Sequence, residues 1–456
     1  MEIQQIVEAQ RAYYESGATQ PLQSRTQALD RLLDGLTRYE DRLAAALQQD
    51  LGKAPFESYM TELGLVRDEL RWQRGHIKRY AKPRRAVTPL AQFKAKSVVS
   101  PRPYGVVLVM APWNYPVQLS LEPLIGAVAA GNCVVLKPSD YAPQTARVLA
   151  ALVAECFDSR HAAVVLGGRQ QNQDLLDQRF DRIFFTGGEK VGRLVLEKAA
   201  RHLTPVTLEL GGKSPCIVTK SADLALAARR IVFGKFLNAG QTCVAPDYLL
   251  VQRDVQPQLV ELLGREIGQA FGPDPLACGE YPKIVNDKHF ARLLGLLEGQ
   301  NVVFGGRHDP AARRIEPTVL TEVSPQAPIM QEEIFGPLLP VLTYDKLEEA
   351  MAFVAAREHP LALYLFTTDK AQERQVLDRL QFGGGCVNDT IIHLATSHMP
   401  FGGVGRSGMG SYHGKQSFDT FTHYRSIVKK SNRIDLPVRY HPYDEKKFAL
   451  LRRFLR

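Results

Sequence analysis

Short apolar runs alternate with helical stretches through the middle of the chain, and this alternation is its strongest constraint on fold. The predicted strands of the first half are 104–110, 133–136, 162–166, 182–186 and 205–210, and the helices between them are 119–130, 143–156 and 189–202. Strands that are apolar throughout, joined by helical crossovers, are typical of a parallel sheet covered on both faces. The chain is therefore predicted to have an α/β fold.

The length of 456 residues exceeds what one hydrophobic core usually supports, so two or three domains are expected. Residues 1–80 have the apolar periodicity of helices. A second α/β region is expected from about residue 211 to 401. Its candidate strands are 215–219, 248–251, 362–367 and 386–388, and further strands are expected near 95–99 and 422–429.

Composition excludes several classes of protein. The six cysteines form no CxxC pair, so neither a disulfide scaffold nor a metal site is expected. Such cysteine usage predicts a reducing, cytoplasmic location. Neither a signal peptide nor a membrane-spanning run is visible. The net charge of +9 is spread along the chain, so no nucleic-acid partner is expected. The tail 446–456 has the pattern of a short basic amphipathic helix, which would allow contact with a membrane surface.

A cysteine and a glutamate are the first candidates for chemistry. Cys243 follows an apolar, helix-like run, and Glu209 ends a predicted strand before two glycines. A thiol and a carboxylate at the ends of buried elements suit nucleophilic catalysis with a general base. The alternative is a buried structural cysteine and a glutamate that caps a helix, because free cysteine is among the most buried residue types.

Ordered motifs decide between these interpretations. They are 111–116 (APWNYP), 136–139 (LKPS), 208–215 (LELGGKSP), 240–246 (GQTCVAP), 332–337 (EEIFGP), 400–405 (PFGGVG) and 408–415 (GMGSYHGK). With them the chain resembles an aldehyde dehydrogenase of the short class 3 branch. The resemblance implies an aldehyde dehydrogenase-like fold with a Rossmann-type cofactor domain (1–81 and 103–208) and an α/β catalytic domain (209–410). It also implies a small β oligomerisation arm with a C-terminal tail (82–102 and 411–456), and a homodimer.

The resemblance also implies roles for individual residues. Cys243 would attack the aldehyde to form a thiohemiacetal and then a thioester, with the Asn114 amide and the backbone N–H of Cys243 binding the oxyanion. Glu209 would activate the water that releases a carboxylic acid, and Glu333 is a second candidate for this base. Relatives that transfer the acyl group to coenzyme A often lack the carboxylate at position 209.

NAD or NADP is the implied cofactor. The residues expected to bind it are Trp113, Lys137, Asp140, Gly187, Gly188, Gly192, Glu333 and Phe335. The chain departs from the family pattern in two places. Gly188 and Glu189 replace residues that are usually serine and a small residue, and a carboxylate at 189 would repel pyrophosphate. Asp140 is shorter than the usual glutamate, which leaves room for the 2′-phosphate of NADP.

An apolar substrate tunnel is also implied. Its expected lining is Tyr115, Leu119, Phe233, Leu237, Thr242, Ile391, Leu394 and Phe401. Such a wall favours medium-chain aliphatic or aromatic aldehydes over substrates that carry a second carboxylate. The alternatives are a coenzyme A-acylating or reductase relative on the same fold, and a crystallin-like structural protein.

Overall fold

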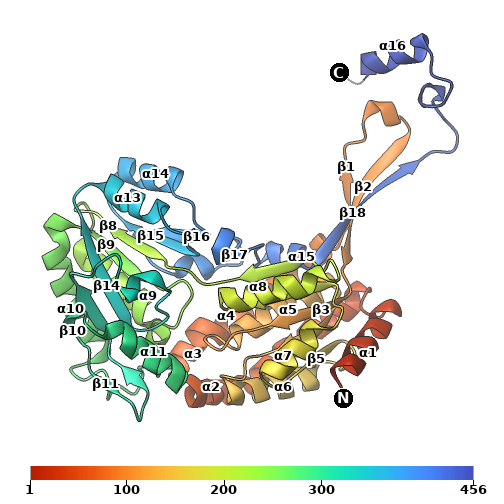
Figure 1. The fold of residues 1–456 in the computed structure, drawn as a ribbon. Helices are drawn as coiled ribbons and strands as arrows, with labels where there is room; N and C mark the ends of the chain where they lie inside the picture. Colours follow the sequence, from red (N-terminus) through yellow and green to blue (C-terminus); the bar gives the residue numbers. More distant parts are fainter. Residues whose placement is uncertain (1, 455–456) are drawn as a thin grey trace.

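The computed structural model describes residues 2–454 and contains two large sheets with helices on both faces (Figure 1). One sheet has six strands in the order β17-β7-β6-β3-β4-β5, and only the β17–β7 pair is antiparallel. Its strands are β3 (Val106–Met110), β4 (Cys133–Lys137), β5 (Ala162–Val164), β6 (Arg182–Thr186), β7 (Val206–Glu209) and β17 (Gly408–Met409). The α/β fold is thus confirmed, and the strands expected in this half occur with small shifts at their ends.

Side chains of the central strand β3 alternate between two cores. Val107 and Val109 pack with one set of helices, whereas Val106 and Leu108 pack with another. The first set is α2 (Leu22–Leu51), α4 (Gly64–Tyr80), α5 (Gln118–Ala130) and α6 (Pro143–Cys156), and the second is α1 (Ile3–Glu15), α7 (Arg169–Leu176) and α8 (Glu189–Ala200). Both faces are buried, which explains why the strand is apolar at every position.

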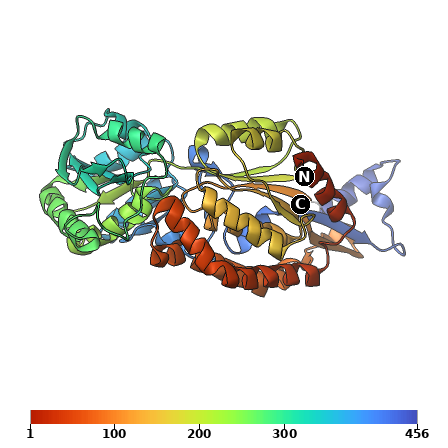
Figure 2. The ribbon, with the colours of Figure 1, turned by 90° about the horizontal axis from the view of Figure 1, so that it is seen from below.

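The second sheet has seven strands in the order β10-β13-β14-β9-β8-β15-β16, with only β10 antiparallel to its neighbour. Its strands are β8 (Pro215–Val218), β9 (Tyr248–Gln252), β10 (Asn301–Phe304), β13 (Thr318–Thr321), β14 (Leu338–Tyr344), β15 (Ala362–Phe366) and β16 (Gly384–Val387). One face packs on α9 (Leu224–Phe236) and α10 (Gln256–Phe271), and the other on α11 (Asp287–Leu297), α13 (Leu347–Ala355) and α14 (Lys370–Arg379). Seen from below, the two sheets with their helices form two lobes side by side (Figure 2).

Shorter elements complete the body. They are α3 (Pro55–Ser58), the hairpin of β11 (His308–Asp309) and β12 (Arg314–Ile315), α12 (Pro328–Gln331) and α15 (Lys415–Thr420). A π-helical turn, Tyr59–Leu63, joins α3 to α4. Such turns insert an extra residue into a helix and are frequent at functional sites.

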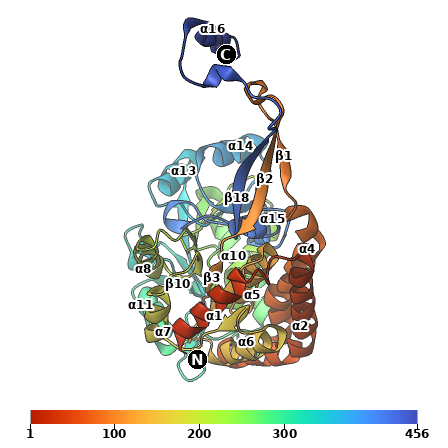
Figure 3. The ribbon, with the colours of Figure 1, turned by 90° about the vertical axis from the view of Figure 1, so that its right-hand side faces the viewer.

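A three-stranded antiparallel arm projects from the six-stranded lobe (Figures 1 and 3). Its strands are β1 (Arg84–Ala86), β2 (Ala95–Pro103) and β18 (Thr422–Lys430), and the tail beyond it forms α16 (Glu445–Phe454). The domain boundaries expected from the sequence remain predictions. Among residues 2–454, no helix is both long enough and apolar enough to cross a membrane.

Candidate functional site

A cleft of about 360 Å³ lies at the carboxyl ends of β3, β6 and β7. Parallel sheets place ligand sites at this edge. The cleft brings together these residues singled out in the sequence: Trp113, Asn114, Leu119, Gly187, Gly188, Glu209, Cys243, Glu333 and Phe335. They come from both lobes, so the cleft exists only when the two lobes meet.

A second, mostly apolar cavity of about 230 Å³ also borders Cys243. Its lining includes every residue expected in the substrate tunnel: Tyr115, Leu119, Phe233, Leu237, Thr242, Ile391, Leu394 and Phe401. Cys243 and Leu119 border both cavities. The sulfur is therefore placed where a ligand in the cleft and an apolar ligand in the tunnel would meet.

The loop that carries Cys243 has an unusual backbone. After α9, Asn238 and Ala239 adopt positive φ angles of 51° and 52°, and Gly240 follows at 73°. Burial raises the pKa of the Cys243 thiol to about 12, and the Glu333 and Glu209 carboxylates add to the rise. The backbone N–H groups of Cys243 and Val244 act in the opposite direction. In the absence of a ligand the thiol is thus neutral near pH 7.

Asn114 follows β3 and is buried next to the cysteine loop. Its Nδ2 donates a hydrogen bond of 3.1 Å to the carbonyl oxygen of Gln241. A side-chain amide has two N–H donors, so one donor is left for a substrate oxygen. Tyr115 and Thr242 form a second link, because their hydroxyl oxygens share a hydrogen bond of 2.6 Å.

Two buried carboxyl groups face the same cleft. Burial raises the pKa of Glu209 well above its ordinary value. Burial, together with the Asp247 carboxylate, raises the pKa of Glu333 to about 8. Within the described residues, both carboxylate oxygens of Glu209 and Oε1 of Glu333 lack a hydrogen-bond partner. Buried polar groups without partners mark a place where water or a ligand binds.

The cleft has the features that a dinucleotide needs. Gly187 and Gly188 precede α8, whose N-terminus can bind phosphate. A Cβ at Gly187 would lie 2.6 Å from the Phe185 ring, so glycine keeps this turn tight. Thr186 Oγ1 is buried without a partner among residues 2–454, and the Phe335 ring meets Trp113 edge to face at 5.3 Å.

Three expected cofactor residues lie outside the lining of this cleft. Lys137 is the last residue of β4, and its Nζ donates a 2.7 Å hydrogen bond to the Pro138 carbonyl. Burial lowers the pKa of Lys137, and the Asp140 carboxylate partly opposes this change. Lys137 and Asp140 thus belong to one end of the sheet. A Cβ at Gly192 would lie 2.8 Å from Leu210 Cδ2, so Gly192 allows α8 to pack closely on the sheet.

Glu189 is neutralised by arginines. Both its oxygens accept hydrogen bonds from Arg406, of 3.0 and 2.9 Å, and Arg193 donates to Oε1 as well. These arginines lower the pKa of Glu189. The repulsion of pyrophosphate that the sequence alone suggests is therefore offset by paired cations.

Sequence reasoning missed several residues of the two cavities. His289 and Arg292 line the cleft, whereas Gln118 and Tyr412 line the tunnel. His289 packs against Trp113 with ring centroids 5.3 Å apart, and burial lowers its pKa to about 4. His289 and Arg292 belong to α11, far along the chain, and no local pattern marks them. No cluster of metal-ligating side chains occurs within residues 2–454.

Comparisons with known proteins agree with this geometry. The model of the aldehyde dehydrogenase family matches residues 1–427. A 4,4'-diaponeurosporen-aldehyde dehydrogenase of Staphylococcus aureus is 46% identical over 448 residues, which cover 98% of this chain and 97% of that protein. A dimeric, NADP-preferring aldehyde dehydrogenase of Canis lupus familiaris is 43% identical, over 96% of this chain and 98% of its own. The solved substrate-bound state of Staphylococcus aureus AldH matches with a TM-score of 0.98 and 45% identity, and covers 100% of both chains.

Proposed function

The chain belongs to the aldehyde dehydrogenase family, and we propose that it oxidises medium-chain aliphatic or aromatic aldehydes through a thioester on Cys243. Its general activity is NAD(P)-dependent oxidation of an aldehyde to a carboxylic acid. One observation carries the finer proposal: Cys243 borders both an apolar tunnel and a cleft lined by an amide and two buried carboxyl groups. Among residues 2–454, no arginine or lysine lines that tunnel, so a hydrocarbon chain or ring suits it best.

The residues of the site support each step of this chemistry. The Cys243 thiolate forms a carbon–sulfur bond with the aldehyde carbon, and the new oxyanion accepts hydrogen bonds from Asn114 Nδ2 and the backbone N–H of Cys243. NAD or NADP held by the residues of the cleft would supply the hydride acceptor, and loss of a hydride from this carbon would leave a thioester on Cys243. Glu209 or Glu333 then takes a proton from water, the hydroxide attacks the thioester and the carbon–sulfur bond breaks to release the acid.

The cofactor would lie in the cleft with its pyrophosphate at the N-terminus of α8. Lys137 and Asp140 are the residues proposed to reach the adenosine ribose, and Glu333 and Phe335 the nicotinamide half. Use of both NAD and NADP is supported by the short Asp140 side chain and by the canine relative, which is named as NADP-preferring.

We also propose a homodimer in the cytoplasm. The arm leaves the outer edge of β18 without a partner strand among residues 2–454, and such edges can pair with a second chain. The canine relative is described as dimeric. The six free cysteines are typical of a reducing compartment.

Steady-state oxidation of hexanal and benzaldehyde with NAD and NADP in parallel tests the proposal. Turnover is expected with the wild-type protein, and Cys243→Ala is expected to abolish it because no other group supplies the thioester. Cys278→Ala is the matched control, since Cys278 lines neither cavity, and it should keep its activity. Turnover retained in Cys243→Ala, with cofactor binding intact, would contradict the proposal.

A further inference from the structure

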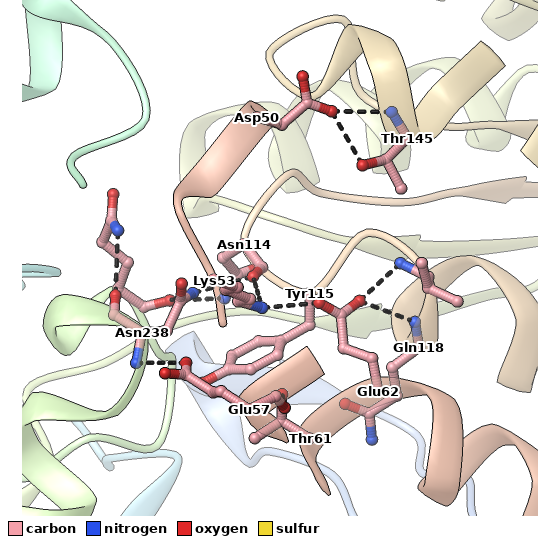
Figure 4. A network of polar contacts seen from close by, with 12 residues as sticks. Asp50, Lys53, Glu57, Thr61, Glu62, Asn114, Tyr115, Gln118, Thr145 and Asn238 are labelled. Atoms are coloured by element: carbon pink, nitrogen blue, oxygen red, sulfur yellow. Dashed lines mark hydrogen bonds and ion pairs between the residues drawn. The ribbon is translucent and has the colours of Figure 1, made fainter. Parts of the chain in front are cut away.

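A buried ion pair lies next to Asn114 (Figure 4). Lys53 Nζ and Glu62 Oε1 are 2.7 Å apart, and both side chains are completely buried. Lys53 lies between α2 and α3, and Glu62 belongs to the π-helical turn. Neither residue lines the cleft or the tunnel, so neither can touch the substrate.

Lys53 contacts the main chain of Asn114, the residue proposed to bind the oxyanion. Lys53 Nζ donates a 2.8 Å hydrogen bond to the carbonyl oxygen of Asn114, and Asn238 Nδ2 donates another of 2.9 Å to the same atom. A carbonyl oxygen has two lone pairs, so these two donors occupy it fully. Lys53 Nζ also lies 3.9 Å above the centroid of the Tyr115 ring. Lys53 thus contacts both the Asn114 carbonyl and the side chain of the next residue, Tyr115.

The glutamate holds the next segment of the same chain. Glu62 Oε2 accepts hydrogen bonds from the backbone N–H groups of Val117, at 2.7 Å, and Gln118, at 3.3 Å. These N–H groups lie at the start of α5, where the helix itself provides no acceptor. Lys53 and Glu62 together therefore fix residues 114–118 against the π-helical turn.

Asn238 connects this arrangement to the cysteine loop. It lies at a positive φ of 51°, its backbone N–H donates to Glu57 Oε1 at 2.9 Å, and its Nδ2 reaches the carbonyl of Gln241 at 3.1 Å. The Asn114 side chain donates to the same Gln241 carbonyl. One set of contacts thus sets the position of the Asn114 amide relative to the loop that ends at Cys243.

We propose that Lys53, with Glu62 as its counter-ion, is a positioning residue that aims the Asn114 amide at the oxyanion formed on Cys243. The inference rests on the proposed function, because it needs an oxyanion at that position. A buried ion pair contributes little to stability compared with apolar residues of similar size, so stability alone does not explain this pair. The hydrogen bond from Lys53 to the Asn114 carbonyl gives the pair a role in positioning Asn114.

The test removes the pair without leaving a lone buried charge. In Lys53→Met/Glu62→Gln, the glutamine Oε1 can still accept from the Val117 N–H. We expect a thermal midpoint close to that of the wild type and a KM for hexanal and a Kd for NAD within about 2-fold. We expect kcat to fall by about 10-fold or more, because deletion of a whole oxyanion donor typically costs ~10²–10³-fold. Lys53→Met alone should lose stability as well, since it strands Glu62.

Arg25→Met is the control for loss of a buried cation. Arg25 is buried on α2 and donates to the carbonyls of Thr19, Gln20 and Ala130, remote from the cysteine loop. This variant should lose stability and keep its kcat. If Arg25→Met lowers kcat as much as the double variant does, the effect is general and the inference is wrong.

A double-mutant cycle with Asn114→Ala gives the decisive readout. If Lys53 works through the Asn114 amide, the Lys53→Met/Glu62→Gln change should lower kcat by less than about 2-fold in the Asn114→Ala background. Equal losses in both backgrounds, or an unchanged kcat in the double variant, would overturn the inference while the proposed function stands. Absence of wild-type turnover with hexanal would instead overturn the proposed function, and the inference with it.

Discussion

At the scale of single residues, burial sets the protonation of the reactive groups. The pKa values of Cys243, Glu209 and Glu333 are all raised, chiefly because the charged forms would lie in a dry environment. The free protein therefore holds a neutral thiol beside carboxyl groups that favour the protonated form. A positive charge brought into the cleft would lower all of these values and would activate the thiol.

The base that releases the acid can be identified by separating the two half-reactions. Glu209→Gln is expected to keep a rapid burst of reduced cofactor and to slow the following steady state by about 10²-fold, as for loss of a general base. The reason is that hydride transfer precedes the attack of water. Stopped-flow absorbance at the reduced-cofactor band measures both phases.

Glu333→Gln is the matched comparison, and pH distinguishes the two carboxyl groups. Only the ionised form takes a proton, so hydrolysis through Glu333, with its pKa of about 8, would speed up as pH rises and level off above about 8. The outcome that contradicts the assignment to Glu209 is a slow steady state in Glu333→Gln, without the increase of the hydrolysis rate with pH, together with normal hydrolysis in Glu209→Gln. Glu333 would then be the base.

At the scale of elements, a short strand pair places Glu209. β17 pairs antiparallel with β7, and Gly408 lies opposite Glu209. Gly408 has a φ of 150°, and a Cβ there would lie 2.4 Å from the carbonyl oxygen of Leu208. Only glycine allows this approach, which explains a glycine inside a strand.

Gly408→Ala is expected to destabilise the protein by roughly 1–3 kcal/mol, as for other residues forced into strained backbone conformations. It should also slow hydrolysis of the thioester, because β17 must shift away from the strand that ends at Glu209. Denaturant unfolding and burst kinetics measure the two effects. Met409→Ala, at a half-exposed position of the same strand, is the control and should change both little. Wild-type behaviour of Gly408→Ala would show that β17 does not position the glutamate.

At the scale of the whole molecule, the two lobes share one cleft, and the arm projects away from the body (Figure 1). The cleft takes Asn114 from one lobe and Glu333 from the other. The arm exposes apolar side chains at Val87, Leu90 and Val428. Exposed apolar side chains beside open strand edges are typical of a surface that meets another chain.

Light scattering tests the proposed dimer. The wild-type chain of 50.8 kDa should give about twice that mass, and Val428→Asp should shift it toward the monomer because a charge would be buried at the new contact. Leu203→Asp replaces an exposed leucine away from the arm and should leave the mass unchanged. A wild-type monomer, or a Val428→Asp dimer as stable as the wild type, would contradict the proposal.

Much of the molecule could be predicted from the sequence because the relevant signals are local. The predicted ends of helix α6 and of strand β6 are the ends that the structure shows. The order of apolar runs determined an α/β fold, because strands buried on both faces must be apolar throughout. The motifs around Asn114, Glu209 and Cys243 determined which chemical groups are available, and the family followed from their order.

Only the tertiary structure decided how these groups act together. The sequence does not reveal that Lys53 meets the Asn114 carbonyl, or that His289 faces Trp113. It also does not reveal that arginines neutralise Glu189, nor that burial raises the pKa of Glu333. The physical reason is range: residue type and backbone preference act between neighbours along the chain, whereas desolvation and hydrogen bonding depend on residues that only folding brings together.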